Sequence, residues 1–285
     1  MTAYTGYVDD TGAFANQNFL QVLHDKLVLE GWSVLRYDTV SEPRELIAKG
    51  VGYSGTEEIF IGFRSYQDVG ADYYNLSVAC FTGYVSGNAF DAQPGYKENS
   101  VCGHNLRIDY WLNISPQRVA FTLKIGTPVY QHGYVGKFFP YFTPSQYPYP
   151  VACIGMLPGR STLRFSSATP TFGYRGSVAQ TSIRVLSGVW QQADAWPFNS
   201  QGVCATTEDV SRGYANQRDT NGTYSLLPVT LMASNTDVYG ELEGVYYISG
   251  FSNATENTGS DSGKNFVVVQ DHNRNGFNDY IALEV

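Results

Sequence analysis

The stretch IDYWLNISPQRVAFTLKI, residues 108–125, has apolar residues at alternate positions on both sides of a short polar segment. The alternating apolar residues are Ile108, Tyr110, Leu112 and Ile114 before it and Val119, Phe121, Leu123 and Ile125 after it. This period of two is typical of strands with one buried face, and SPQR between them is typical of a turn. The stretch predicts an antiparallel hairpin and hence a fold rich in strands.

The rest of the chain contains one helix pattern and several further strand patterns. NQNFLQVLHDKLVLEG, residues 16–31, repeats apolar residues every three or four positions, and Gly31 stands where a helix commonly ends. The strand patterns are WSVLRY (32–37), EEIFIGFRSY (57–66), YYNLSVACF (73–81), TSIRVL (181–186), YSLLPVTLM (224–232), GVYYISGF (244–251), NFVVVQD (265–271) and DYIALEV (279–285).

These patterns predict a β-rich α+β protein. We expect an N-terminal helix packed on an antiparallel sheet, followed by a mainly-β C-terminal domain. The Ser-, Thr- and Gly-rich passage at 159–177 marks the boundary, so the predicted domains are 1–165 and 175–285.

Composition restricts the classes of function. Aromatic residues make up 15% of the chain and charged residues only 15%, which suits packed strands and their contacts. The net charge is −8, and no Lys or Arg occurs between Arg218 and Lys264, so we expect no direct sequence-specific binding of nucleic acid. No apolar run is long enough to predict membrane insertion, and the N-terminus lacks the pattern of a secretory signal.

The cysteines and histidines do not indicate a cofactor site. Cys80, Cys102, Cys153 and Cys204 are widely spaced, which predicts reduced, buried thiols instead of a zinc site or a disulfide framework. The four histidines are scattered, and none neighbours a nucleophile motif. We therefore predict no bound cofactor and no catalytic residues.

The segment YVGKFFPYFTPSQYPYP, residues 134–150, combines rings with prolines. Its four prolines argue against a helix or a central strand and predict an extended, partly polyproline II conformation. The rings either brace the N-terminal sheet or contact a neighbouring subunit, and the sequence leaves both readings open. The candidate interface residues are Tyr134, Phe138, Phe139, Tyr141, Phe142, Tyr147 and Tyr149.

The stretch DHNRNGFND, residues 271–279, partly matches a calcium-binding loop. The candidate ligands are Asp271, Asn273, Asn275 and Asp279. The twelfth position is Ala282, where such a loop needs a bidentate Glu, and strand patterns flank the stretch. A hairpin turn with Asn-Gly at its centre is therefore favoured, and calcium stays the alternative.

Several longer stretches resemble a known family. They are GWSVLRYD, GYSGTEEIFIGFRSYQDVGADYYNLSVACFTGY, DYWLNISPQRVAFTLKIGTPVYQHGYVGKFFPYFTPSQYPYPV, GELEGVYYISGFSNATENTG and NFVVVQDHNRNGFNDYIALEV. Together the stretches cover most of the chain and resemble a family of virion structural proteins of tailed bacteriophages. YVGKFFPYFTPSQYPYP is the most specific of these elements.

The resemblance implies a non-enzymatic component of the virion, in the tail, baseplate or neck (collar). Such a component is synthesised in the host cytoplasm, contacts other virion structural proteins and forms homo-oligomers. Two alternatives remain open. The first is a receptor- or glycan-binding protein at the tail tip, because exposed rings also stack on sugars. The second is a depolymerase with paired carboxylates, whose separation the sequence does not reveal.

Overall fold

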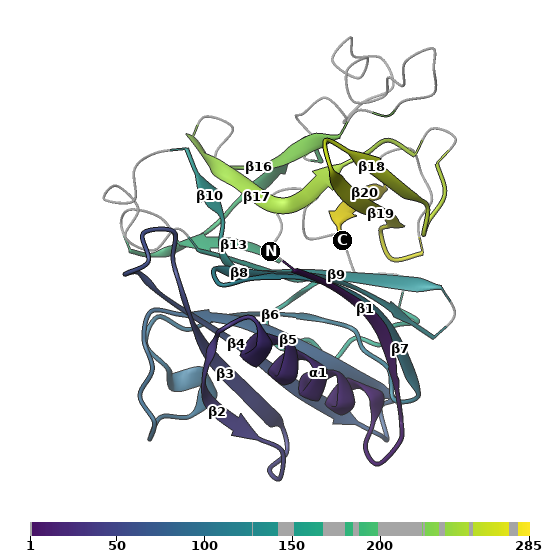
Figure 1. Ribbon diagram of the computed structural model, residues 1–285. Coiled ribbons are helices and arrows are strands. Elements are labelled where there is room, and N and C mark those ends of the chain that lie inside the picture. The colour runs from purple at the N-terminus through teal and green to yellow at the C-terminus, as the bar shows by residue number, and fades with distance from the viewer. Residues whose placement is uncertain are drawn as a thin grey trace.

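The computed structural model shows a protein built mainly of strands. It describes residues 2–126, 128–141, 151–167, 180–184, 188–198, 224, 226–233, 237–250, 253–273 and 279–285. These residues form three antiparallel sheets and one α-helix, so the predicted β-rich character is confirmed. Figure 1 shows the sheets as three layers, one above another.

The central sheet contains the hairpin at residues 108–125. Its strands, in spatial order, are β1 (Thr2–Asp9), β7 (Arg107–Ser115), β8 (Arg118–Ile125), β9 (Val129–Lys137), β11 (Val151–Ile154), β13 (Thr181–Arg184) and β14 (Trp190–Gln192). Ser115 pairs with Arg118 and Ile108 with Ile125, so Pro116 and Gln117 form the loop between β7 and β8. The predicted hairpin is confirmed.

The second sheet lies below the central sheet in Figure 1. Its strands, in spatial order, are β12 (Leu157–Pro158), β6 (Lys97–Val101), β5 (Tyr73–Phe81), β4 (Glu58–Asp68), β3 (Arg44–Val51) and β2 (Ser33–Asp38). A short 3-10 helix, η1 (Phe90–Ala92), lies between β5 and β6 in the chain. The strands predicted at 32–37, 57–66 and 73–81 correspond to β2, β4 and β5 within two residues.

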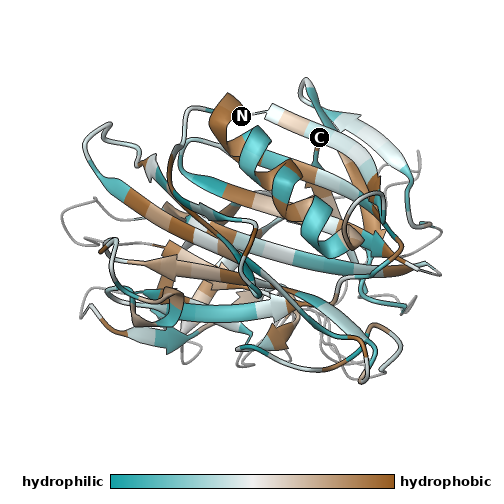
Figure 2. Ribbon diagram, turned by 90° about the horizontal axis from the view of Figure 1, so that it is seen from below, coloured by the Kyte–Doolittle hydropathy of each residue, from teal (hydrophilic) through white to brown (hydrophobic). Residues whose placement is uncertain are grey.

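Helix α1 (Ala15–Leu29) has one buried side. Phe19, Leu20, Leu23 and Leu27 belong to one apolar cluster with residues of the central and second sheets. Figure 2, seen from below, shows the helix with both hydrophobic and hydrophilic bands. Gly31 follows the helix with φ +83°, a conformation that glycine adopts at low cost. No helix in the described parts of the chain is both long and apolar enough to cross a membrane.

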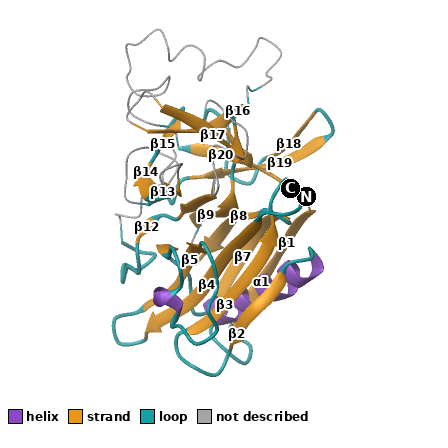
Figure 3. Ribbon diagram, turned by 90° about the vertical axis from the view of Figure 1, so that its left-hand side faces the viewer, coloured by secondary structure: helices purple, strands orange, loops and turns teal. Residues whose placement is uncertain are grey.

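The third sheet lies above the central sheet (Figures 1 and 3). Its strands, in spatial order, are β15 (Asp194–Trp196), β16 (Leu227–Ala233), β17 (Asp237–Tyr247), β20 (Tyr280–Glu284), β19 (Lys264–Gln270) and β18 (Thr258–Asp261), and the short β10 (Phe139–Pro140) also pairs with β17. The strands β13 and β14 lie after residue 175 in the chain yet belong to the central sheet. The division into domains 1–165 and 175–285 stays a prediction.

One expectation about the proline-rich segment is wrong. Residues 134–137 belong to β9, which lies between β8 and β11 inside the central sheet. The prolines do not prevent this, because the first of them is Pro140 and a proline restricts only its own position and the one before it. Among the described residues of the segment, Pro140 lies in the short edge strand β10, where proline is tolerated.

Three of the predicted buried thiols are confirmed. Cys80, Cys102 and Cys153 are free and buried, and Cys204 lies outside the described residues. Burial raises the pKa of Cys102 to about 12, so this thiol stays protonated and unreactive at neutral pH.

Candidate functional site

The aromatic segment divides into a buried part and an exposed part. Tyr134 and Phe138 are fully buried in a core cluster between the central and third sheets. Phe139 and Tyr141 are 46% and 47% exposed. The buried rings therefore brace the sheets, and the exposed rings are available for contacts. Phe142, Tyr147 and Tyr149 lie outside the described residues.

A close backbone approach positions the exposed rings. Phe139 pairs with Glu241 and Pro140 with Gly240, which joins β10 to the third sheet. A Cβ atom at Gly240 would lie 2.1 Å from the carbonyl oxygen of Phe139, so only glycine allows this approach. Tyr141 continues the contact, because its backbone N–H donates to the carbonyl oxygen of Tyr239 at 3.1 Å.

A third ring comes from a distant part of the chain. Tyr53 follows β3, is 38% exposed, and lies edge-on to Phe139 with ring centroids 6.1 Å apart. We call Tyr53, Phe139 and Tyr141 the aromatic shelf. No pattern in the sequence indicated that Tyr53 would join these rings, because GVGYSGTEE, residues 50–58, predicts only a loop. The contact between Tyr53 and Phe139 arises from the packing of the sheets.

A cation–π contact and a hydrogen bond hold the Tyr53 side chain. The fully buried amine of Lys137 donates to both carboxylate oxygens of Glu57 at 2.5 Å and lies 5.1 Å from the centroid of the Tyr53 ring. The Tyr53 hydroxyl donates to the carboxylate of Glu243. Burial is the main reason that the pKa of Tyr53 is raised, so this hydroxyl remains a donor at neutral pH.

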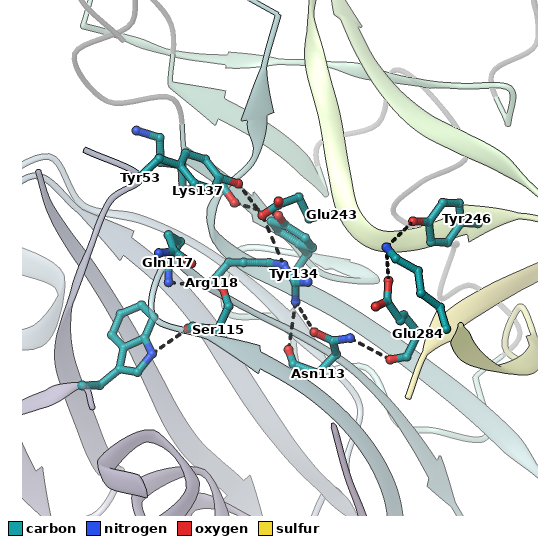
Figure 4. A network of polar contacts seen from close by, with 12 residues as sticks. Tyr53, Asn113, Ser115, Gln117, Arg118, Tyr134, Lys137, Glu243, Tyr246 and Glu284 are labelled. Atoms are coloured by element: carbon teal, nitrogen blue, oxygen red, sulfur yellow. Dashed lines mark hydrogen bonds and ion pairs between the residues drawn. The ribbon is translucent and has the colours of Figure 1, made fainter. Parts of the chain in front are cut away.

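Arg118 lies near Tyr53, because both side chains contact Glu243, and the Arg118 side chain is fully buried. Figure 4 shows its contacts with Asn113. Its Nη1 donates to Asn113 at two points, the backbone oxygen at 3.0 Å and Oδ1 at 2.6 Å. Its Nε lies 3.9 Å from the Glu243 carboxylate. Gly244, with φ +75°, leaves room for the guanidinium, because a Cβ atom there would lie 2.8 Å from Nη2. Arg118 thereby connects the central sheet to the third sheet.

The loop of the β7–β8 hairpin is bonded on several sides. The Ser115 carbonyl accepts from the Trp32 indole at 2.9 Å, and the Pro116 carbonyl accepts from the Val51 N–H at 3.0 Å. The Gln117 carbonyl accepts from the backbone N–H of Lys137 at 2.9 Å. The first two bonds link the hairpin to Trp32 and to β3 of the second sheet, and the third lies within the central sheet. The backbone near Tyr53 and at the end of β9 is therefore held in place in the free protein.

The shelf has a chemical character suited to binding by contact. Its rings are flanked by carboxylates, since the Tyr141 hydroxyl donates to Glu241 at 3.2 Å and Tyr53 donates to Glu243. The neighbouring cations Arg118 and Lys137 are buried. Exposed Tyr and Phe on an ordered base are the residues that protein interfaces use at their centres.

The stretch 271–279 closes a hairpin. β19 pairs with β20 up to Gln270 and Tyr280, and the N–H of Asp271 donates to the carbonyl oxygen of Asp279 at 2.7 Å. Asp271 and Asp279 are buried, Asn273 is described, and Asn275 is not. No group of three or more acidic, His or Cys side chains that could hold a metal occurs in the described parts of the chain. The pairing confirms the hairpin, and calcium binding stays an untested alternative.

No family model matches the chain, and no curated protein matches it significantly.

Proposed function

We propose that this protein is a structural component of a tailed-phage virion, in the tail, baseplate or neck, and that it acts through contacts with other virion proteins and with copies of itself. The proposal includes synthesis in the host cytoplasm and assigns no catalytic role. The observation that supports it is the aromatic shelf. Its three large rings are partly exposed, and two of them, Phe139 and Tyr141, come from the segment in which Tyr134 and Phe138 are buried.

The architecture of the shelf suits permanent assembly. Binding loses less conformational entropy when the contacting side chains are already ordered in the free subunit. The bonds of Arg118, Lys137 and the β7–β8 loop provide that order before any partner arrives. In this proposal residues 1–165, with α1 packed on an antiparallel sheet, and the β-rich residues 175–285 act as units held together beneath the shelf.

The test uses particles that carry altered shelves. The double variant Phe139→Ser with Tyr141→Ser removes two exposed rings, and Tyr7→Ser, at a 58% exposed ring on β1, is the matched control. We expect the double variant to fold and to be absent from purified particles, and the control to be incorporated. Mass spectrometry of the particles measures both.

Two results would contradict the proposal. The first is absence of the wild-type chain from purified infectious particles. The second is full incorporation of the double variant, which would show that the shelf makes no required contact. An alternative function, receptor or glycan binding at a tail tip, has the support of one separate feature, a cavity on the third sheet.

A further inference from the structure

The third sheet has a second apolar cluster on the face turned away from the central sheet. Val267, Val269 and Ile281 belong to the core shared with the central sheet, whereas Phe266, Val268 and Ala282 belong to a separate cluster. Side chains alternate between the faces of a sheet, so the two clusters lie on opposite sides. The second cluster forms the floor of a cavity of about 620 Å³.

The rim of this cavity is polar. Asn257, Thr258, Ser260 and Asp261 line it together with Asn253, and all except Asn253 are exposed. No Lys, Arg or His is among the described residues that line the cavity. An apolar floor with a few converging polar groups, in a volume between about 300 and 1,000 Å³, is the usual form of a small-molecule site.

The rim is already ordered. The N–H of Val268 donates to the Asn257 carbonyl at 2.7 Å, and the Asn257 amide donates to Oδ1 of Asn253 at 3.0 Å. Glu256, next to Asn257, accepts from the Lys124 amine at 2.5 Å and from the Tyr130 hydroxyl at 2.5 Å. Because both of these donors lie on the central sheet, the rim is anchored to the layer below it.

The cavity is open above Gly259. Gly259 pairs with Phe266, so a side chain at this position would stand on the same face as the Phe266 ring. A Cβ atom built on Gly259 would meet nothing within 4 Å. The missing side chain therefore leaves free space beside the apolar floor.

We propose that this cavity binds a neutral saccharide. A pyranose ring has apolar C–H faces that fit the half-buried Tyr224 and Leu226 over this apolar floor, and hydroxyls that donate to the amide and carboxylate oxygens of the rim. A wholly apolar ligand would remove water from those rim groups without replacing their hydrogen bonds. A phosphorylated or carboxylated sugar would bring a second negative charge beside Asp261, and none of the described lining residues carries a positive charge to balance it.

The test measures binding of matched sugars to the full chain by isothermal titration and saturation-transfer NMR. The probes are glucose, N-acetylglucosamine, cellobiose and chitobiose, with glucose 6-phosphate and N-acetylglucosamine 6-phosphate as charged counterparts. We expect at least one neutral probe to bind, and the phosphate on its monosaccharide unit to weaken binding by about tenfold. The variant Asp261→Asn should reduce that discrimination.

The variant Gly259→Leu fills the open space and should weaken binding of the neutral probe by at least about tenfold. Gly87→Leu is the matched control, because a Cβ atom at Gly87 also meets nothing within 4 Å and Gly87 lies far along the chain from the cavity. Should Gly259→Leu fail to fold, Asn257→Ala provides the same test at the rim.

Three outcomes would overturn the proposal: no neutral probe binds, Gly259→Leu binds as well as wild type, or an apolar peptide or fatty acid displaces the sugar. Each leaves the aromatic shelf and its role in assembly unaffected, because that role is measured in particles. Conversely, absence of the chain from particles would not affect a measured sugar affinity.

Discussion

The two faces of the central sheet are both buried, yet they are held in different ways. The face toward the second sheet is apolar, with Leu112 and Phe121 in one cluster with helix α1. The face toward the third sheet also shares an apolar cluster with that sheet, but in addition it contains Asn113, Thr122 and His132, all nearly inaccessible to solvent. Apolar contact depends on area and tolerates small shifts, whereas buried polar groups need partners in defined directions.

The polar face has such partners. The Asn113 amide donates to the backbone oxygen of Glu284 at 2.7 Å. The Nε2 of His132 lies 2.9 Å from the carbonyl oxygen of Gln270 and its Nδ1 lies 3.0 Å from the Thr122 hydroxyl. Since a carbonyl only accepts, Nε2 carries the proton and Nδ1 accepts from Thr122. The comparison teaches that one sheet can join one neighbour mainly by apolar area, and the other by apolar area together with directed hydrogen bonds.

The largest effect is expected on the apolar face. Phe121→Ala should lower the free energy of unfolding by about 3–5 kcal/mol, because Phe121 is fully buried and packs near Phe19. Urea denaturation measures the change. A loss of unfolding free energy below about 1 kcal/mol would mean that close packing does not stabilise the apolar face. The proposed difference between the two faces would then be wrong.

A smaller effect is expected from one polar partner. Asn113→Leu keeps the branching of the side chain but removes one of the two acceptors of Arg118, Oδ1, and the donor to Glu284. Hydrogen bonds to charged groups contribute about 1.5–3 kcal/mol, so the variant should lose a similar amount. Hydrogen exchange should show faster exchange in β20 than in β4. Equal acceleration in both strands would contradict a separate polar attachment of the third sheet.

The polar face should also respond to acid. Burial lowers the pKa of His132 from 6.5 to about 3, opposed by its bond to Gln270 and assisted by the nearby His272. Below pH 6.5 the unfolded chain binds a proton that the folded chain does not, so stability falls by about 1.4 kcal/mol per pH unit until about pH 3. At pH 5 the expected loss is about 2 kcal/mol.

The comparison of wild type with His132→Gln isolates this contribution. Denaturation at pH 7 and pH 5 should show a stability difference that is about 2 kcal/mol smaller in the variant. Because other titrating groups are common to both proteins, their contributions cancel. Equal pH dependence in the two proteins would mean that His132 is not held neutral against the third sheet.

The smallest effect on stability is expected at the shelf. Tyr141→Ser should change the free energy of unfolding by no more than about 1 kcal/mol, because Tyr141 is nearly half exposed and its hydroxyl donates to Glu241 at the surface. Thermal unfolding measures this. A loss comparable to that of Phe121→Ala would place Tyr141 in the core and remove the basis for treating it as a contact residue.

Local patterns predicted the elements well where neighbours in the chain determine them. The helix at 16–31, the hairpin at 108–125 and the strand at 73–81 each show a clear period, and each is present. The prolines of the segment do not predict the strand β9 at residues 134–137. The first of them, Pro140, restricts the backbone of the preceding residue only, so it has no effect on residues 134–137. The shelf was predicted in part, through Phe139 and Tyr141, and its third ring, Tyr53, was not.

The sequence by itself determined which residues alternate along β7 and β8 and which side of each strand is apolar, because the period of two acts between neighbours in the chain. Only the tertiary structure decided that the other, polar side is buried as well. In the sequence, polar residues such as Asn113 and His132 are expected to face solvent. In the structure the third sheet covers both, and their hydrogen-bond partners Glu284 and Gln270 lie far along the chain. Packing between the sheets brings these groups together, and the alternation of residues along a single strand does not predict such contacts.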